Sequence, residues 1–390
     1  MNTERFLSKK VVEMPRSGIR EFFDLVTGSK DIISLGVGEP DFVTPWNIRE
    51  AAIFSLEKGH TTYTSNLGLE SLRREIARYV ENFFGVSYNP KNEILPTIGV
   101  SEAIDLALRC LLTPGDEVLY HEPCYVSYAP TVMLAGGVAT PVETSIDDLF
   151  ALNPAKLEAA ITPRTKVLML NFPTNPTGSI APLEVLQQIA DICVKHDLFV
   201  LTDEIYCELR YDGIRHTSIA SLPGMKDRTL LLHGFSKAFA MTGFRLGYCC
   251  GPHELIEQMC KIHSYTMICP TITSQEAGIE ALRNGTPAML EMRDSYHMRR
   301  DYIVKRFNDM GMDCHLPGGA FYTFPSIKRF GLSSKEFALR LLQEQKVAGV
   351  PGTAFGACGE GYLRCCYATA FSLLEQACDK MERFCDSLKA

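Results

Sequence analysis

The 390-residue sequence has no long hydrophobic run and no excess of positive charge. Its start, MNTERFLSKK, is charged and lacks the apolar segment of a signal peptide, and no apolar run approaches the roughly 20 residues that span a bilayer. The net charge is -7 and the basic residues are scattered among acids, so no basic stripe is available for nucleic acid. We therefore expect a cytoplasmic protein that binds neither membranes nor nucleic acid.

The sequence also lacks the spacings that mark a disulfide framework or a metal site. Its 14 cysteines form no C-x-x-C pair, and its 9 histidines do not fall at metal-ligand spacing with cysteines or acids. The adjacent pairs Cys249-Cys250 and Cys365-Cys366 lie in apolar, strand-like runs, where neighbouring side chains point to opposite faces. We interpret the cysteines as buried free thiols and expect no metal.

A dinucleotide-binding fingerprint is missing as well. The run Gly36-Val37-Gly38 lacks the third glycine, and Pro40 follows where a helix would have to begin. Two glycines before a proline mark a tight loop instead. These residues support two interpretations equally, close approach of a ligand to the backbone at Gly38 and a plain turn.

What the sequence has in quantity is apolar residues, 46% of the chain, together with 29 glycines. At this length it predicts one large core and a smaller second unit. Through the middle of the chain, short apolar strands alternate with helical patterns, which indicates a mostly parallel sheet covered by helices on both faces. The last third is helical with glycine-rich loops and one apolar strand, which indicates a smaller α+β domain.

The expected elements of the sheet follow from these patterns. We expect strands at 117–121, 138–142, 166–171, 198–202 and 229–235, and helices at 101–112, 125–135, 154–161 and 183–196.

The stretch HGFSKAFAMTGFRLG contains the candidate catalytic residue, Lys237. It follows the apolar run 229–232 at the expected mouth of a buried sheet, where desolvation and neighbouring cations lower the pKa of a lysine and favour Schiff-base chemistry. Ser236 and Arg245 would face the same pocket as donors to a phosphate. A lysine beside a phosphate site suggests pyridoxal phosphate, although Ser-Lys after a strand is, taken alone, most often a surface feature.

Other polar residues come directly after expected strands. Asn175 follows the strand at 166–171, and Asp203 and Tyr206 follow the strand at 198–202. Ligands of parallel sheets collect beyond the carboxyl ends of the strands. An acid buried there requires a cation, and a protonated pyridine nitrogen is one, so Asp203 would keep the cofactor ring an electron sink. Asn175 and Tyr206 are candidates to hydrogen-bond the phenolate oxygen of the ring.

Two further positions suggest anion binding. The backbone amides of Gly99 and Val100 and the hydroxyl of Ser101 begin a helix, as in many phosphate sites. On the local sequence alone, a simple N-cap at Ser101 is the more frequent situation. Arg364 lies within the apolar strand YLRCCYA, and the α-carboxylate of an amino acid would suit a buried guanidinium. A solvent-facing edge position is the alternative for Arg364.

The chain resembles the class I/II aminotransferases of the aspartate aminotransferase fold type. The motifs LGVGEPDF, NFPTNPTG, TDEIY, GFSKAFAMTGFRLGY, PGGAFY and GYLRCCYA carry this resemblance, in the family's order and over nearly the whole length. The sequence is most similar to the bacterial and archaeal branch that includes the N-acetyl-diaminopimelate aminotransferases and the aromatic aminotransferases. The resemblance implies an α/β fold of type I, with an N-terminal arm and part of the small domain at 1–45, a large pyridoxal-phosphate domain at 46–284 and a small C-terminal domain at 285–390.

The resemblance also implies the roles of individual residues. Lys237 becomes the Schiff-base lysine and proton shuttle, Asp203 the partner of the pyridine nitrogen, and Tyr125 the aromatic residue that stacks on the ring. Asn175 and Tyr206 are implied to bind the ring oxygen. The remaining implied positions are the phosphate cup, Gly99, Val100, Ser101, Ser236 and Arg245; the tyrosine that reaches the phosphate of the partner subunit, Tyr63; and the α-carboxylate site, Gly38, Asn175 and Arg364.

The implied activity is ping-pong transfer of an amino group from an L-amino acid to a 2-oxo acid in a homodimer with shared active sites. Glutamate and 2-oxoglutarate are expected as one substrate pair. A C–S β-lyase and, more distantly, a non-catalytic sensor are the alternatives. The segment 263–267 lacks the arginine with which enteric-type aspartate aminotransferases bind a side-chain carboxylate. Aromatic, aspartate, alanine-like and acetylated diaminopimelate donors therefore all stay open.

Overall fold

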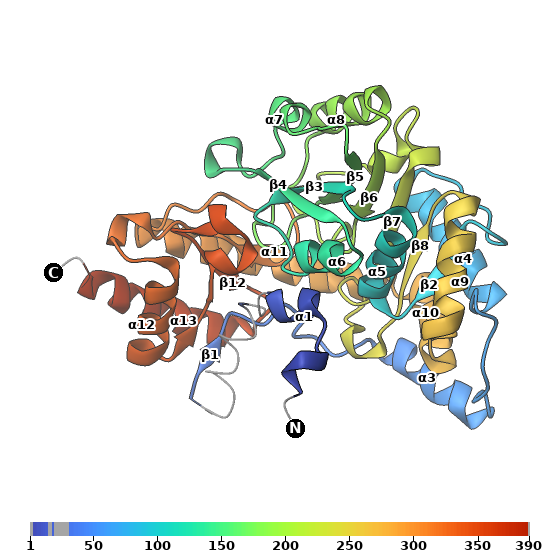
Figure 1. Ribbon diagram of the computed structural model, residues 1–390. Helices are drawn as coiled ribbons and strands as arrows, with labels where there is room; N and C mark the ends of the chain where they lie inside the picture. Colours follow the sequence, from blue (N-terminus) through green and yellow to red (C-terminus); the bar gives the residue numbers. More distant parts are fainter. Residues whose placement is uncertain (1–2, 15–17, 19–30, 389–390) are drawn as a thin grey trace.

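A seven-stranded sheet forms the centre of the larger part of the molecule (Figure 1). The computed structural model describes residues 3–14, 18 and 31–388, so most of 15–30, within the expected N-terminal arm, lies outside the described residues. The strand order is β2-β8-β7-β6-β5-β3-β4, and β8 alone runs antiparallel to its neighbours. The strands are β2 (Ile94–Thr97), β3 (Glu117–Glu122), β4 (Val138–Glu143), β5 (Thr165–Asn171), β6 (Phe199–Asp203), β7 (Thr229–Gly234) and β8 (Gly247–Cys250).

The mostly parallel sheet expected from the sequence is confirmed, and the ends of the five expected strands lie within one residue of expectation. The strand β8 was expected only as a strand-like run at Cys249-Cys250 and not as part of the alternation, because it follows β7 through a loop without a crossover helix. That loop contains Lys237 and Arg245, so the antiparallel strand returns the chain to the same end of the sheet.

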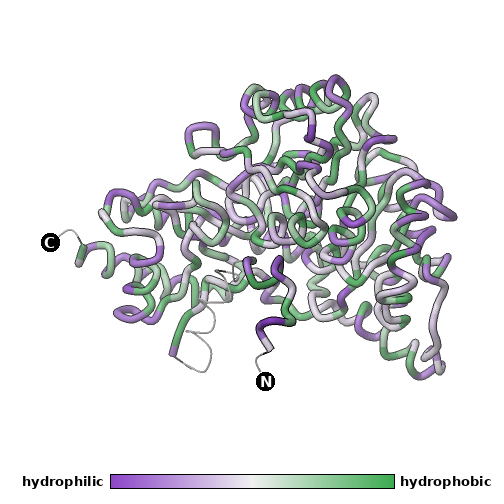
Figure 2. The backbone as a smooth tube through the Cα atoms, in the orientation of Figure 1, coloured by the Kyte–Doolittle hydropathy of each residue, from purple (hydrophilic) through white to green (hydrophobic). Residues whose placement is uncertain are grey.

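Helices cover both faces of this sheet, and each presents an apolar stripe to it. One face packs against α5 (Gly99–Leu111), α6 (Tyr128–Leu134) and α9 (His253–Thr266). The other packs against α8 (Leu183–Lys195) at the β3 end and against α4 (Glu70–Phe84), α10 (Ile272–Asn284) and α11 (Thr286–Asp309) at the β7 end. Figure 2 shows hydrophobic and hydrophilic residues alternating along these helices, the pattern of a helix with one buried side. The helices α1 (Lys9–Glu13), α3 (Trp46–Glu57) and α7 (Pro154–Ala159) lie further out (Figure 1).

The helix expected at 125–135 is wrong at its start, since α6 begins only at Tyr128. The preceding residues are held in a turn, in which the amide of Cys124 donates to the carbonyl of Phe355 and the amide of Tyr128 donates to that of Tyr125. The consequence is that Tyr125 lies on a loop beside the carboxyl end of β3 rather than inside a helix.

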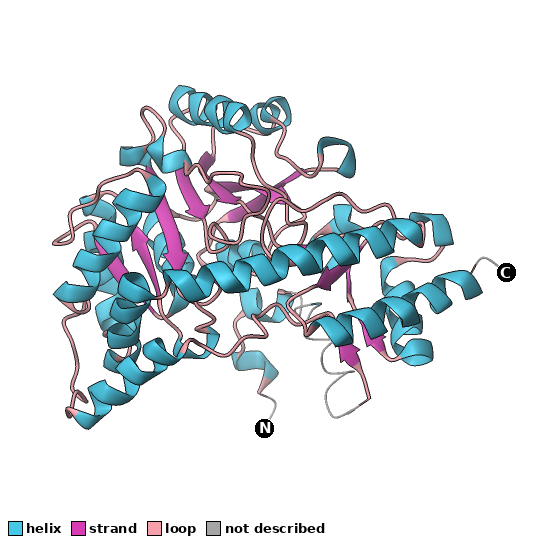
Figure 3. Cartoon of the chain, turned by 180° about the vertical axis from the view of Figure 1, so that it is seen from behind, coloured by secondary structure: helices cyan, strands magenta, loops and turns pink. Residues whose placement is uncertain are grey.

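The C-terminal third forms a smaller group of elements. A three-stranded sheet joins β11 (Val350–Pro351), β12 (Leu363–Cys366) and β9 (Tyr322–Thr323), and helices α12 (Ser334–Gln345) and α13 (Phe371–Ser387) pack beside it. The strand β1 (Ile33–Ser34) pairs in parallel with β10 (Val347–Ala348), which joins an early segment of the chain to this part. Figure 3 shows the long helix α11 crossing from the large sheet to the C-terminal elements.

The interpretation of the cysteines as free thiols is confirmed. All 14 lie among the described residues, where none forms a disulfide and ten are buried. Cys249 and Cys250 pack into the cores on opposite faces of the sheet, as alternating strand residues do. Over the described part of the chain, the helices are too short or too polar to cross a membrane.

We predict that Leu231→Ala in β7 lowers the free energy of unfolding by about 2–5 kcal/mol, because the removed methyl groups leave a cavity in a packed core. Leu231 is 0% exposed and belongs to the core under α4 and α10. Urea unfolding followed by circular dichroism measures the change. The matched variant Leu183→Ala alters an exposed residue at the start of α8 and should shift the unfolding free energy by less than about 0.5 kcal/mol.

Candidate active site

The candidate active site is a cavity of about 470 Å³ beyond the carboxyl ends of β5, β6 and β7. It brings together eleven of the residues expected from the sequence: Gly38, Val100, Ser101, Tyr125, Asn175, Asp203, Tyr206, Ser236, Lys237, Arg245 and Arg364. They come from segments far apart in the chain, as expected for a site at the end of a parallel sheet.

Lys237 projects into the cavity from the loop between β7 and β8. Its Nζ donates a hydrogen bond of 2.6 Å to the carbonyl of Gly38 and lies 5.8 Å from the ring centre of Tyr206 and 5.6 Å from that of Phe321. Burial lowers the pKa of Lys237 to about 8, and the cations of Arg364 and Arg245 contribute to the lowering. A much larger fraction of this amine than of an exposed lysine is therefore unprotonated, and nucleophilic, near neutral pH.

Asp203 ends β6 with its carboxylate buried. It accepts hydrogen bonds from the hydroxyl of Tyr128 at 2.7 Å and from the amide of Ile205 at 3.2 Å. Burial raises the pKa of Asp203 to about 6, and the bond from Tyr128 opposes this rise. None of the ion pairs among the described residues includes Asp203. A cationic group in the cavity would remove that penalty and keep the carboxylate ionised.

The loop after β5 is fixed to the end of β6 by Asn171. Its Nδ2 donates to the carbonyl of Asp203 at 2.8 Å, and its Oδ1 accepts from the amide of Asn175 at 3.1 Å. The hydroxyls of Tyr206 and Tyr322 are 2.9 Å apart at the wall of the same cavity. Asn171 therefore fixes the backbone of both Asp203 and Asn175, and the two tyrosine hydroxyls fix each other at the cavity wall.

Arg364 is buried in β12, at 2% exposure, without an acidic partner among the described residues. Its Nη1 donates to Oδ1 of Asn175 at 3.0 Å and its Nη2 to the carbonyl of Gly36 at 2.5 Å, while its Nε has no hydrogen-bond partner. The guanidinium also lies over the ring of Tyr322, 4.7 Å from its centre. A buried cation with an unpaired donor beside a cavity is suited to receive a carboxylate.

The start of α5 and the β7–β8 loop form the anion-binding side of the cavity. Gly99 has a φ of +73°, and a Cβ there would lie 2.6 Å from Nη2 of Arg245. A Cβ at Gly247 would lie 2.6 Å from the backbone of Gly99 and Val100. The two glycines therefore allow the guanidinium and the β8 backbone to approach the helix N-terminus, where free amides, Ser236 and Arg245 are the donors that a phosphate requires.

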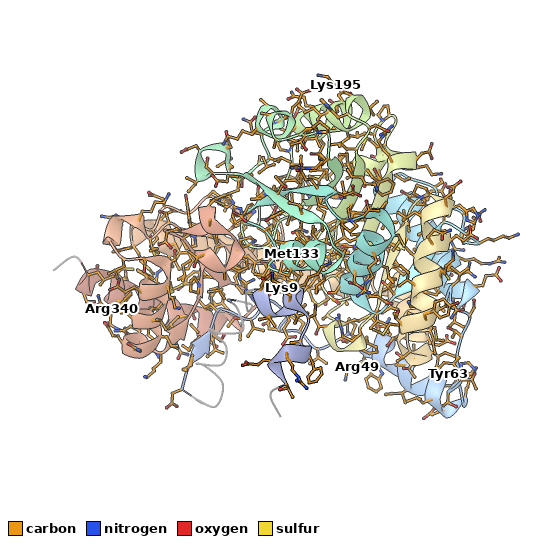
Figure 4. All side chains as sticks on the ribbon, in the orientation of Figure 1. Lys9, Arg49, Tyr63, Met133, Lys195 and Arg340 are labelled. Carbon is orange, nitrogen blue, oxygen red and sulfur yellow. The ribbon has the colours of Figure 1, made fainter. Side chains whose placement is uncertain are left out.

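Two expected site residues are not among those that line the cavity: Gly99, which lies beside Val100 and Arg245, and Tyr63, which lies away from it. The side chain of Tyr63 is 79% exposed on the loop after α3 (Figure 4). Its expected contact with the phosphate of a partner subunit stays a prediction.

Several residues that shape the site were not expected from the sequence: Tyr128, Asn171, Tyr322, Gly36 and Glu39. Asn171 had a detectable signal, because it is the polar residue that ends an apolar strand. Tyr128 had none, since its contact with Asp203 depends on the turn that delays the start of α6.

The donor set of the cavity fits pyridoxal phosphate. A helix N-terminus with Ser236 and Arg245 suits its phosphate, the buried carboxylate of Asp203 suits a protonated pyridine nitrogen, and the amine of Lys237 suits its aldehyde. Arg364 also lines the cavity, and because it pairs with no acid among the described residues its guanidinium is left for a substrate carboxylate.

Comparison with known proteins agrees with this arrangement. The sequence pattern of the family described as "Aminotransferase class I and II" matches residues 30–381. The chain is 47% identical to the aspartate aminotransferase of Pyrococcus abyssi, over 94% of this chain and 95% of that protein. It is 45% identical to aromatic-amino-acid aminotransferase 2 of Thermococcus litoralis, over 97% of each. The crystal structure of an aromatic aminotransferase from Pyrococcus horikoshii superposes with a TM-score of 0.91 at 45% identity, covering 95% of this chain and 99% of that one.

We predict that Lys237 titrates about two units below the other lysines, because its pKa of about 8 compares with about 10.4 for an exposed lysine. Reductive methylation with ¹³C-formaldehyde followed by NMR titration measures this directly. One resonance should change position around pH 8 and should be missing in Lys237→Met. A resonance of Lys237 that titrates together with the other lysines would contradict the prediction.

Proposed function

Since the chain belongs to the class I and II aminotransferases, enzymes that depend on pyridoxal phosphate, we propose that it transfers the amino group of an L-amino acid to a 2-oxo acid in two successive half-reactions. The observation that carries the proposal is the meeting of Lys237, Asp203 and Arg364 around one cavity. An amine, an acid without a cation and a cation without an acid are the three groups that the cofactor and an amino acid together require.

When bound, pyridoxal phosphate supplies an aldehyde carbon that amines attack and a ring that withdraws electrons from the α-carbon of the substrate. Lys237 would hold the cofactor through its amine and would carry the α-proton of the substrate on Nζ. Asp203 would keep the ring nitrogen protonated, and Tyr206 and Asn175 would donate to the ring oxygen. Tyr125 would pack on the ring, and the phosphate would be held by Gly99, Val100, Ser101, Ser236 and Arg245.

Arg364 and Asn175 are proposed to orient the substrate through its α-carboxylate. The guanidinium is already fixed by its bonds to the carbonyl of Gly36 and the side chain of Asn175, so the directions of its remaining N–H donors limit the geometry with which a carboxylate can bind. The carbonyl of Gly38 lies in the same cavity and accepts a hydrogen bond from Lys237. A Cβ at Gly38 would lie 2.6 Å from the hydroxyl of Tyr322. Glycine at this position therefore keeps the site open.

The amino acid that serves as amino donor is determined by the part of the cavity that receives the substrate's side chain. Three cations line the cavity within the part of the chain that is described, Lys237, Arg245 and Arg364, and each has a proposed role. We propose glutamate and 2-oxoglutarate as one pair, supported by the similarity to an aspartate aminotransferase, and an aromatic donor as a candidate for the other, supported by the aromatic relatives.

We also propose a homodimer in which Tyr63 reaches the phosphate site of the partner subunit. Large apolar side chains are exposed around the same part of the molecule, on α3, on the loop that follows it and at the C-terminal end of α9: Trp46, Ile53, Phe54, Leu56, Tyr63, Tyr265 and Met267. Such side chains are seldom left in water over a whole helix, so this surface suits a second copy of the chain.

The expected domain limits, 1–45, 46–284 and 285–390, are supported by the pairing of β1 with β10 and by the separate small sheet. The cytoplasmic location stays a prediction.

The proposal predicts a half-reaction that can be followed without an acceptor. The purified enzyme loaded with cofactor should show a visible absorption band, which moves to the near ultraviolet when an amino acid donor is added. A panel of glutamate, aspartate, alanine and aromatic amino acids should identify the donor class. Pyruvate and ammonia as products would favour the β-lyase alternative, and the absence of any band would contradict the proposed function.

Lys237→Ala should lose at least roughly 10³-fold in turnover, because it removes both the amine and the proton carrier. The protein should still fold, since the side chain makes one polar contact, with Gly38. Steady-state transamination and circular dichroism measure the two effects. The control is Lys195→Ala, which removes an exposed lysine of α8 paired with Glu158, and should leave the activity unchanged.

Arg364→Lys should raise KM for the amino acid and for the 2-oxo acid by roughly ten- to a hundred-fold, because a point charge replaces a planar group with paired donors. Both half-reactions should be affected, since both substrates carry the same α-carboxylate. Arg340→Lys on the exposed face of α12 is the matched control, and its KM values should equal those of the unmodified enzyme. Equal KM values in Arg364→Lys would contradict the assigned role.

A further inference from the structure

A buried polar cluster lies behind the cavity, on the side away from the substrate. It consists of His233 of β7, Cys207 and Glu208 from the turn after β6, and Tyr79 of α4. The side chains of His233 and Glu208 are 1% and 0% exposed. No step of the proposed transamination uses them.

With Glu208 ionised, both ring nitrogens of His233 face oxygens that can only accept a hydrogen bond, and Nδ1 lies a further 3.9 Å from Sγ of Cys207. Nε2 lies 2.8 Å from the carboxylate oxygen Oε1 of Glu208, and Nδ1 lies 3.1 Å from the backbone carbonyl oxygen of Glu204. Two such contacts require a proton on each nitrogen, so the geometry is that of an imidazolium. In agreement with this geometry, the pKa of His233 is raised above its usual value. Burial alone would lower it, but the carboxylate of Glu208 favours the charged ring.

Glu208 is surrounded by donors, as an ionised carboxylate would be. Besides His233, the hydroxyl of Tyr79 donates to Oε1 and the thiol of Cys207 lies 3.2 Å from Oε2. The imidazolium and the hydrogen bonds hold the pKa of Glu208 below its usual value although the group is buried. The rings of Tyr79 and His233 also stack, with centres 6.2 Å apart. Glu208 and His233 therefore form a buried ion pair in which both side chains also make further hydrogen bonds.

This cluster is not a metal site, although a cysteine, an acid and a histidine lie together in it. His233 has no free lone pair, because both of its nitrogens donate. Glu208 already accepts from three side chains. A metal would have to displace every one of these contacts.

The contacts of His233 connect the segments that carry the cofactor residues. Glu204 follows Asp203 directly, Glu208 comes two residues after Tyr206, and His233 comes four residues before Lys237. We propose that His233 is a positioning residue for the cofactor: its imidazolium ties the turn of Asp203 and Tyr206 to the strand of Lys237 and places a fixed positive charge behind Asp203. This inference rests on the proposed function, because the cofactor is the group being positioned.

The charge acts on Asp203 directly. Burial raises the pKa of Asp203, and the imidazolium of His233 is one of the groups that oppose this rise. The other titratable groups that face the cluster are Cys207, Glu204 and Glu208 from the turn, Arg210 after it, His216 beside Glu204, Tyr79 from α4 and Tyr248 from β8. Arg210 acts on Cys207 and Glu204, whereas His233 is the cation of this group that lowers the pKa of Asp203. Removal of His233 therefore leaves Asp203 and the bound ring in a more negative surrounding.

The test compares His233→Gln with the unmodified holoenzyme. Glutamine keeps a donor for Glu208 and removes the charge. Two quantities are measured besides activity: the dissociation constant of pyridoxal phosphate, by fluorescence quenching, and the pH midpoint of the visible band of the bound cofactor. We expect affinity to fall about ten-fold or more. We expect the midpoint to move to higher pH, since removing a positive charge raises the pKa of every neighbouring group.

The control is His315→Gln. His315 is likewise buried, packs against Phe150 and has no hydrogen-bonded side chain partner, because both of its ring nitrogens are unpaired among the described residues. This variant should lose some stability and leave both cofactor measurements unchanged. Equal changes in the two variants would overturn the proposal, because the loss of any buried histidine would then suffice.

A folded His233→Gln enzyme with the affinity and midpoint of the unmodified protein would also overturn it. Should that variant fail to fold, the double variant His233→Gln/Glu208→Gln keeps an uncharged hydrogen-bonded pair and is judged by the same two measurements. These outcomes differ from a failure of the proposed function, in which the unmodified protein itself shows no visible band.

Discussion

The arrangement of the active site depends on the guanidinium of Arg364, which is buried without a carboxylate partner among the described residues. Arg364 lies in β12 with its charge balanced, among the described residues, only by the neutral oxygens of Asn175 and Gly36. A lone buried charge is costly, and the surrounding contacts keep it fixed beside the cavity. Across the cavity, Asp203 is an acid without a cation and Lys237 an amine whose pKa is lowered. The chain therefore holds unpaired groups that a bound cofactor and substrate complete.

Much of this arrangement could be predicted from the sequence, because the relevant residues follow apolar strands. Asp203, Asn175 and Lys237 each come at or just after the end of a strand in a parallel sheet, and strand ends meet at one edge. The alternation of apolar runs with helical patterns was sufficient to predict that sheet. The same periodicity gave no sign of β8 as an antiparallel member, since its position depends on the loop that contains Arg245.

Other parts of the site could not be predicted, because they depend on contacts between distant segments. Tyr128 reaches Asp203 only because the amide of Cys124 bonds to Phe355 and α6 starts late. The imidazolium of His233 depends on Glu208, which lies 25 residues away in the sequence. In the sequence, His233 looks like a single structural histidine at a strand end. Its charge becomes evident only when both acceptors are placed around the ring.

The positions of Lys237 and Arg364 have a mechanical consequence. Lys237 follows β7 of the large sheet, Arg364 lies in the small C-terminal sheet, and both line the same cavity. In the proposed reaction, an amino acid bound by Arg364 at its carboxylate and by Lys237 near its amine would connect the two parts of the molecule. The connection would form and break once in every half-reaction.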